Sequence, residues 1–220
     1  MAISPSDILR VLRGCEIPRE RRKSVRKSNS DPKRGMCLGY VTKYDTGFVA
    51  SQFTREAPEL SRVLCRFAAE QYPNFKFSSI MVNEGGSGLH VDKGNLGPSL
   101  IMSVGDHVGG ELWQYPNVTL RIKNRLRPCD GRLPHITLPF EGERYSIVYF
   151  TMKAQAAPPA PVERALLRSC GFRAPNQNSS DDRATARSDL LPHAAHILRK
   201  EWGLHKSYIG DYTNKSLKKR

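Results

Sequence analysis

Three side chains that commonly bind transition metals have a spacing that can form one site. His90 and Asp92 stand two residues apart, and in an extended segment side chains at i and i+2 project to the same face, so both can reach one metal ion. His135 follows Asp92 by 43 residues, which is enough chain to pass through several strands and return opposite. Two histidines and one carboxylate suit Fe(II), because they leave adjacent coordination positions open. Zinc also binds such residues, but its catalytic sites usually keep only one open position.

A second polar group begins nine residues after His135. Arg144 and Ser146 open a mostly apolar stretch, and the same period of two places their side chains on one face. A guanidinium and a hydroxyl on one face of a barrel can bind a carboxylate together. A dicarboxylate cosubstrate fits this pair, with its keto-acid end on the iron, its far carboxylate on Arg144, and O2 in the remaining open position. The alternative is that Arg144 is a surface arginine on an edge strand.

Several other residues have both a functional and an ordinary interpretation. Asn83 is a candidate for binding cosubstrate or substrate, or it caps the glycine-rich turn that follows it. Lys93 can neutralise a phosphate near the iron, although a lysine beside a carboxylate more often lies in solvent or pairs locally. His107, in a glycine-rich loop, is expected to lie in solvent. Trp113 and Tyr115 alternate on one stretch and are expected to pack in the core rather than to stack on a base.

The apolar pattern indicates the elements that must carry these residues. A helix is predicted from Glu56 to Gln71, with Pro58 in its first turn. Beyond it, short apolar or alternating stretches separated by glycine-rich turns are typical of a β-sandwich or barrel. Strands are expected at residues 75–82, 88–91, 100–104, 111–115, 118–122, near 127, 134–138 and 144–152.

Three segments are expected along the chain, whose 220 residues suit one compact domain with appendages. Residues 1–35 are predicted to be a basic flexible arm, because the run from Arg19 to Arg34 has almost no apolar residues. Residues 36–152 are expected to form the β domain. Residues 153–220 are predicted to contain an Ala/Pro-rich linker, short helices at 162–170 and 189–202, and a basic tail.

Composition narrows the class of protein. The chain has no run of 18 or more apolar residues and does not begin with a basic and then apolar segment, so neither a membrane span nor a secretory signal is predicted. We therefore expect an intracellular protein, in the nucleus or the cytoplasm. The five cysteines are scattered and never form Cys-x-x-Cys, which argues against a disulfide framework or a zinc ribbon.

The formal charge of +14 is concentrated in the flanks. Lys and Arg outnumber Asp and Glu by 10 to 4 in residues 1–35 and by 13 to 6 in residues 153–220, but only by 12 to 11 in residues 36–152. Basic terminal segments of this kind bind nucleic acid through its phosphates or act as a nuclear import signal. They are also found as solvated tails that only aid solubility.

Residues from about 36 to 152 resemble the superfamily of 2-oxoglutarate- and Fe(II)-dependent dioxygenases. The likeness is greatest to its TET/JBP-like branch, which oxidises bases in nucleic acid. The matching residues are Ser78 to Asn83, His90-Val91-Asp92-Lys93, Asn95 to Ser99, Gly109 to Leu112, His135, and Gly142 to Ser146. Within these 220 residues we expect neither the cysteine-rich insert nor the added DNA-recognition domain of larger members of that branch.

The resemblance implies a fold that is mainly β with flanking helices, built on a double-stranded β-helix core of the jelly-roll, cupin-like kind. It also implies that His90, Asp92 and His135 hold Fe(II), and that Arg144 anchors 2-oxoglutarate with support from Ser146. The reaction would consume O2, release succinate and CO2, and hydroxylate a C–H bond, with a nucleobase as the first candidate substrate, ahead of a protein side chain and a small metabolite.

Two other functions are compatible with the same residues. One is a metal-binding or catalytically inactive β-helix protein that binds nucleic acid through its basic arms, although the complete ligand set and Arg144 argue against it. The other is a cupin-like metal enzyme that needs no 2-oxoglutarate, in which Arg144 would have no assigned partner. Dependence on the cosubstrate distinguishes the three functions. The sequence does not indicate the oligomeric state.

Overall fold

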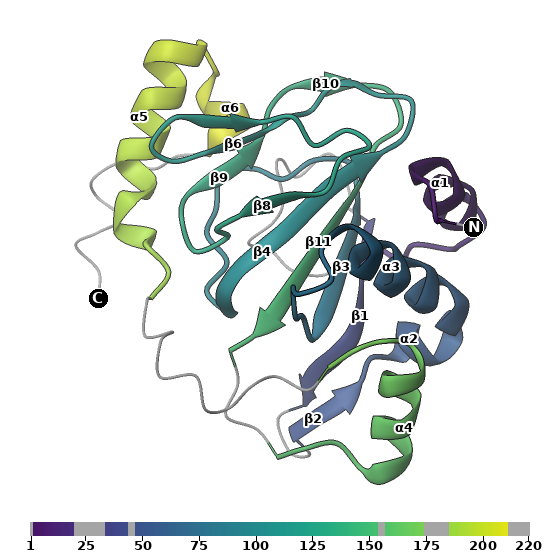
Figure 1. Ribbon diagram of the computed structural model, residues 1–220. Helices are drawn as coiled ribbons and strands as arrows, with labels where there is room; N and C mark the ends of the chain where they lie inside the picture. Colours follow the sequence, from purple (N-terminus) through teal and green to yellow (C-terminus); the bar gives the residue numbers. More distant parts are fainter. Residues whose placement is uncertain (1, 20–33, 44–46, 154–156, 174–184, 211–220) are drawn as a thin grey trace.

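The computed structural model describes residues 2–19, 34–43, 47–153, 157–173 and 185–210 (Figure 1). The described helices are α1 (Pro5–Arg13), α2 (Gln52–Glu56), α3 (Pro58–Gln71), α4 (Pro161–Ser169), η2 (Ser188–Leu190), α5 (Leu191–Trp202) and α6 (Lys206–Ile209). The described strands are β1 (Arg34–Lys43), β2 (Gly47–Ala50), β3 (Ser79–Glu84), β4 (Asn95–Val104), β5 (Val108–Gly109), β6 (Leu112–Gln114), β7 (Val118–Leu120), β8 (Arg127–Cys129), β9 (His135–Thr137), β10 (Phe140–Glu141) and β11 (Tyr145–Met152).

The fold is mainly β with flanking helices, as predicted. Its largest sheet has the strand order β2-β1-β3-β11-β4-β8, and a smaller sheet has the order β7-β6-β9, while β5 pairs with β10. All of the strand pairs are antiparallel, and the two larger sheets form opposite walls of a cavity in a jelly-roll core. No helix in the described ranges has the length and apolarity that crossing a membrane requires.

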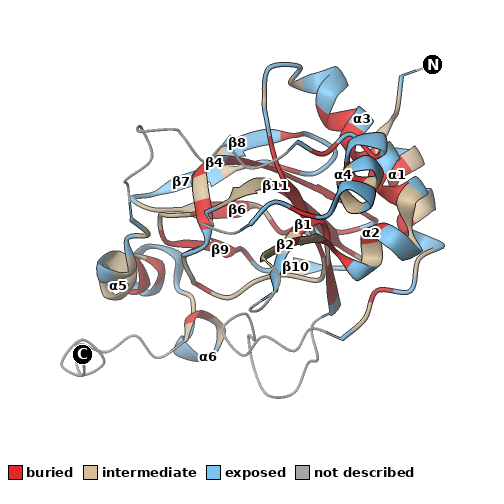
Figure 2. Cartoon of the chain, turned by 90° about the horizontal axis from the view of Figure 1, so that it is seen from below, coloured by how far each residue is buried: buried red, intermediate tan, exposed pale blue. Residues whose placement is uncertain are grey.

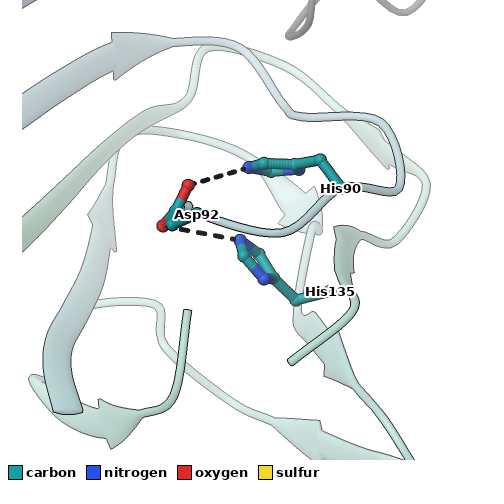
Figure 3. A group of neighbouring side chains, drawn as sticks. All are labelled: His90, Asp92 and His135. Atoms are coloured by element: carbon teal, nitrogen blue, oxygen red, sulfur yellow. Dashed lines mark ion pairs between the residues drawn. The ribbon is translucent and has the colours of Figure 1, made fainter. Parts of the chain in front are cut away.

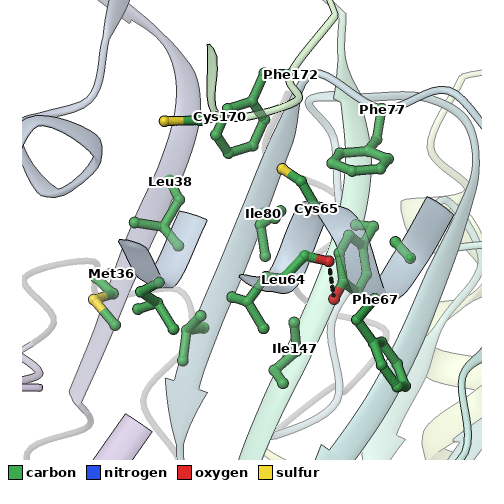
Figure 4. Packing of buried hydrophobic residues seen from close by; sticks show 14 of the residues in the cluster. Met36, Leu38, Leu64, Cys65, Phe67, Phe77, Ile80, Ile147, Cys170 and Phe172 are labelled. Atoms are coloured by element: carbon green, nitrogen blue, oxygen red, sulfur yellow. Dashed lines mark hydrogen bonds between the residues drawn. The ribbon is translucent and has the colours of Figure 1, made fainter. Parts of the chain in front are cut away.

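The large sheet separates a helix-covered face from a cavity face. Leu38, Ile80, Tyr149 and Leu100 lie in register across four neighbouring strands, and each is at most 1% exposed. Together with the apolar sides of α1, α3 and α4 they form the main hydrophobic core, whose packing on Leu64 and Phe67 is drawn in Figure 4. The alternate positions of the same strands point to the other side, because side chains along a strand alternate between faces.

The predicted helix at 56–71 corresponds to α3, which begins at Pro58 because proline favours the first turn of a helix. The preceding helix α2 was not predicted; the hydroxyl of Ser51 caps it by accepting the backbone N–H of Thr54. The predicted strands after residue 75 are present with shifted ends, except that residues 88–91 form an isolated bridge rather than a strand. Strands β1 and β2 were also missed.

The prediction of a flexible arm over residues 1–35 is wrong for its first half. Helix α1 is fixed by a capping box between Ser4 and Asp7, and its Ile8 and Leu12 are buried in the main core against α3. Arg13 forms ion pairs with Asp106 and Glu143 near the start of β11. Residues 20–33, which contain most of the predicted basic run, lie outside the described residues.

The two short helices predicted after residue 152 are present as α4 and α5, and both pack against the rest of the fold. Helix α4 contributes Leu167 to the main core, and Figure 2 shows buried residues along α5 where it faces the sheets. Ala194, Ala195 and Leu198 of α5 form a second core cluster with residues of β6 and β9. The apolar residues spaced along α4 and α5 are therefore the ones that pack these helices against the sheets. Parts of the predicted linkers, at 154–156 and 174–184, and the tail from 211 lie outside the described residues.

Candidate metal centre

The two candidate histidines are neighbours on paired backbone segments. His90 donates its backbone N–H to the carbonyl of His135, and His135 returns the same bond to His90, each at 3.0 Å. This isolated antiparallel bridge places the two residues directly opposite one another, so their side chains project to the same side. The ring centroids are 4.2 Å apart. Two residues 45 positions apart in the sequence are thereby held on one backbone bridge.

Each imidazole is oriented by its own chain. The Nδ1 of His90 lies 2.7 Å from the carbonyl of Gly88, and the Nδ1 of His135 lies 2.8 Å from the carbonyl of Leu133. Because a carbonyl can only accept, each Nδ1 carries the proton, and a neutral ring then presents its lone pair on Nε2. Fixing the tautomer through the second ring nitrogen is characteristic of histidines that bind metals.

The carboxylate of Asp92 faces both Nε2 atoms (Figure 3). Its oxygens lie 3.6 Å from the Nε2 of His90 and 4.0 Å from the Nε2 of His135, both too long for hydrogen bonds. One ligand atom from each residue can be chosen so that all three lie within 4.8 Å of one another. The structure thus brings together the three candidate ligands predicted from the sequence, with one ligand atom of each close enough to share a metal ion.

The position of Asp92 depends on the loop that precedes β9. The backbone N–H of Asp92 donates to the carbonyl of Gly131 at 2.7 Å, and the Nδ2 of Asn95 donates to its side chain at 3.2 Å. A Cβ atom on Gly131 would lie 2.6 Å from the Oδ2 of Asp92, which is closer than real Cβ atoms approach. A side chain at residue 131 would therefore have to displace the Asp92 carboxylate or the loop that holds it. Neither Gly131 nor Asn95 was assigned a role beforehand.

The three residues lie on the wall of a cavity of about 720 Å³. This volume is within the range of small-molecule sites. Most of the lining is apolar, with Met81, Ile101 and Val148 on the large sheet facing Leu112 and His135 on the small one. In the part of the chain that the structure describes, the cluster has three protein ligands, whereas structural zinc sites usually have four. Cys129 also lines the cavity but is outside the cluster; burial and the Asp92 carboxylate raise the pKa of its thiol to about 12.

Arg144 is buried rather than exposed on an edge strand. Its side chain is held by two backbone carbonyls, with Nη1 donating to Gly85 at 2.8 Å and Nη2 to Gly110 at 3.0 Å. It packs over the ring of Phe140, and its Nε is buried without a hydrogen-bond partner. No described carboxylate forms an ion pair with it, and burial lowers its pKa to about 10. A buried cation that no described carboxylate contacts directly is suited to accept an anion.

Polar side chains line the cavity on the strands next to Arg144. Ser146 and Asn83 are register partners on β11 and β3, and both line the cavity. Ser103, the register partner of Ser146 on β4, has a buried hydroxyl without a partner. Ser87 and Thr137 share a hydroxyl contact on the opposite wall. Arg144 itself is not among the residues that line the cavity, so Ser146 and Asn83 are the two predicted cosubstrate residues that the cavity reaches directly.

The structure also places three other residues that had both a functional and an ordinary interpretation, namely His107, Lys93 and Trp113. His107 is 1% exposed and its Nδ1 contacts the carbonyl of Gly109, so the expectation that it lies in solvent is wrong; the glycine-rich loop folds over the ring. Burial lowers its pKa. Lys93 is exposed at the edge of the cavity. Trp113 is fully buried in the second core cluster, as expected.

The C-terminal helices cover the outer side of the segments that carry the two candidate histidines. Leu89 and Ile136, each adjacent in sequence to a candidate ligand, pack in one cluster with α5. The backbone N–H of Arg187 donates to the carbonyl of Arg132, and the hydroxyl of Tyr208 on α6 donates to the carbonyl of Thr137 at 2.9 Å. These two contacts lie on either side of His135 in the sequence. The apolar spacing of α5 was visible in the sequence, but its docking partner was not.

Comparison with known proteins shows likenesses in structure only. No protein-family model matches the chain, and neither does any curated protein. An oxidoreductase of the 2OG-Fe(II) oxygenase family from Burkholderia pseudomallei aligns over 69% of this chain and 81% of its own, with 14% identity and a TM-score of 0.49. NgTET1 in complex with 5mC DNA aligns over 70% of this chain and 68% of its own, with 14% identity and a TM-score of 0.44. The ribosomal oxygenase YcfD from Escherichia coli aligns over 76% and 53%, with 14% identity and a TM-score of 0.32.

Proposed function

We propose that this protein is an Fe(II)- and 2-oxoglutarate-dependent dioxygenase that hydroxylates a C–H bond of its substrate. The observation that carries the proposal is the grouping of His90, Asp92 and His135 on the wall of the cavity, with both imidazole tautomers fixed so that Nε2 faces the carboxylate. Two nitrogens and one oxygen on one side of a metal ion form the facial set of non-haem Fe(II) oxygenases, which leaves the opposite positions open.

The buried polar residues fit the cosubstrate. The Arg144 guanidinium has a desolvated charge, an unpartnered Nε and no described ion pair, so a carboxylate bound beside it would offset the cost of burying the cation. Ser146 and Asn83 offer a hydroxyl and an amide on the cavity wall. When bound, iron and 2-oxoglutarate supply the oxidising chemistry, in which O2 is consumed, succinate and CO2 are released, and one oxygen atom enters a C–H bond of the substrate. Ile101 and Val148 keep that part of the wall apolar and exclude water.

The substrate that we propose first is a nucleobase. A cavity of about 720 Å³ has room for a planar base beside a cosubstrate, and its predominantly apolar wall suits a base taken out of its stack. The basic N-terminal and C-terminal segments, much of which lies outside the described residues, would supply long-range attraction to phosphates.

Succinate release tests this function. The protein is loaded with Fe(II) under anaerobic conditions and then mixed with 2-oxoglutarate and air, either alone or with methylated single-stranded DNA, RNA or peptides. The Asp92→Ala variant is treated in the same way as a control. We expect release that an oligonucleotide stimulates and Asp92→Ala abolishes, together with a base that has gained one oxygen atom by mass spectrometry. Equal succinate from both proteins, with iron shown to be bound to the wild type, would contradict the oxygenase. Stimulation by peptides alone would reject the nucleobase.

A further inference from the structure

One short segment of the β domain is strongly basic, although the domain as a whole is nearly neutral. Residues 121–127 read Arg-Ile-Lys-Asn-Arg-Leu-Arg, and no acidic residue occurs between Glu111 and Asp130. The four cations, Arg121, Lys123, Arg125 and Arg127, are here called the basic stripe. All four are exposed. They are separate from the basic terminal segments discussed above.

The backbone of the stripe is fixed to the large sheet. The carbonyl of Ile122 accepts the backbone N–H of Ser103 at 2.8 Å, and the N–H of Asn124 donates back to Ser103 at 2.7 Å. Ile122 is 1% exposed and Leu126 is 7% exposed, so the apolar residues between the cations are anchored inside. A surface whose backbone is already ordered loses little conformational entropy when it binds a partner.

The cations of the stripe have little to neutralise them. Among the described residues, no acidic side chain forms an ion pair with Arg121, Arg125 or Arg127, while Lys123 donates to the backbone carbonyl of His107. Three of the four also line a second pocket of about 250 Å³, where Glu111 is the one acidic residue. The lining of that pocket therefore has a formal charge of about +2, which favours an anion.

The fourth cation, Arg127, extends a row of residues that line the candidate active site. Cys37, Met81, Val148 and Ile101 lie in register across β1, β3, β11 and β4, and all four line the metal-bearing cavity. Arg127 on the edge strand β8 is the next residue in that row, because it is the register partner of Ile101. Register partners project to the same face of a sheet, so Arg127 stands at the cavity side of the edge.

We propose that the basic stripe binds the phosphate backbone of a nucleic-acid strand and leads that strand to the mouth of the cavity. The proposal deepens the function proposed above and rests on it for the identity of the substrate. A line of cations is sufficient to bind phosphates, and arginine forks match phosphate oxygens. An acidic peptide is the less favoured partner, since peptide interfaces are centred on buried apolar or aromatic anchors and the stripe exposes none.

The test is direct binding, without iron or 2-oxoglutarate, of the full chain to a fluorescein-labelled single-stranded DNA 20-mer, measured by anisotropy across a salt series. The stripe variant is Arg121→Gln, Arg125→Gln and Arg127→Gln. Its matched control is Arg62→Gln, Arg66→Gln and Lys76→Gln, which removes the same charge from exposed positions outside both the stripe and the basic terminal segments. We expect the stripe variant to bind roughly 10- to 100-fold more weakly, with a salt slope shallower by about 2, at ~0.7 for each lost phosphate contact. The control should change both values far less.

Equal weakening in the two triple variants would overturn the proposal, because it would show an effect of net charge alone. Tighter binding of poly-glutamate than of the 20-mer, lost in the same stripe variant, would also overturn it and assign the surface to acidic proteins. Because the assay needs no turnover, stripe-dependent binding without succinate release would leave the surface established and reject only the oxygenase. If the stripe variant retains oligonucleotide-stimulated succinate release at wild-type affinity, the oxygenase would be supported and the role of the basic stripe rejected.

Discussion

His90 and His135 exchange both of their backbone hydrogen bonds, each 3.0 Å long, across an isolated antiparallel bridge. The bridge therefore sets the separation of the two imidazoles before any metal binds. Their outward neighbours, Leu89 and Ile136, pack in the cluster under α5, which holds the bridge from the other side. Of the three candidate ligands, Asp92 is the one whose position depends most on a loop, the one that contains Gly131.

Replacing His135 with alanine should remove Fe(II) binding while leaving the fold intact. The backbone bridge to His90 does not need the imidazole, but the metal loses one of three ligands. We expect a loss of affinity greater than the roughly 10- to 100-fold that changes around a ligand cause. Iron binding and circular dichroism measure the two properties, with His196→Ala, exposed on α5, as the control. Full iron binding by His135→Ala would remove this residue from the site.

Gly131→Ala should weaken metal binding although residue 131 is not a ligand. The added Cβ would lie 2.6 Å from the Oδ2 of Asp92 and must displace the carboxylate or the loop. We expect iron affinity to fall roughly 10- to 100-fold. Gly94→Ala is the matched control, because Gly94 also lines the cavity and a Cβ there has no neighbour within 4 Å. Similar iron affinities for the two variants would show that Asp92 is not held by this contact.

Arg144→Met should weaken 2-oxoglutarate binding much more than iron binding. The substitution keeps an apolar chain between Gly85 and Gly110 but removes the cation and its donors. We expect a loss of about 100-fold for the cosubstrate, from a charge-assisted pair of hydrogen bonds worth about 3 kcal/mol, and little change for iron. Lys93→Met removes another cation at the cavity and should affect 2-oxoglutarate far less. Calorimetric titration of each ligand distinguishes these outcomes; parallel losses of both ligands in Arg144→Met would count against its role.

Tyr208→Phe should loosen the C-terminal helices from β9, the strand that carries His135. It deletes the hydroxyl that donates to the Thr137 carbonyl at 2.9 Å, a hydrogen bond worth about 1 kcal/mol. Hydrogen exchange should become faster in α5 and α6. Tyr72→Phe removes a comparable bond, to the carbonyl of Leu126, and should leave exchange in these helices unchanged. Unchanged exchange in Tyr208→Phe would mean that apolar packing alone holds the C-terminal segment.

The spacing of His90 and Asp92 allowed their grouping in one candidate metal site to be predicted, because a period of two depends only on local backbone geometry. The bridge to His135 is a long-range contact. The sequence predicted only that the chain could return opposite His90 and Asp92, without the backbone pairing that the structure shows. The sequence also indicated that Arg144 and Ser146 share a face. It did not reveal that Arg144 would be closed in by Gly85, Gly110 and Phe140, since these contacts come from two separate loops and strand β10.

The N-terminal part of the fold was less predictable. Strand β1 contains two glycines and follows a basic run, so its β pattern was hidden, yet Leu38 lies in the main core. Helix α1 is too short to give a strong period, and only its capping residues mark it. The basic stripe was missed for another reason. Averaging charge over residues 36–152 cancels this local run of cations against acidic residues elsewhere. The run is contiguous in the sequence, but its exposure and its register with the cavity-lining row come from the structure.

Anaerobic titration of the Fe(II)-loaded protein with 2-oxoglutarate tests the proposed site most directly, because a keto acid that chelates Fe(II) produces a weak visible charge-transfer band. We predict a saturable band that is absent when zinc replaces iron and is lost in Asp92→Ala. Iron bound in full without any band on addition of 2-oxoglutarate would contradict the proposed cosubstrate site.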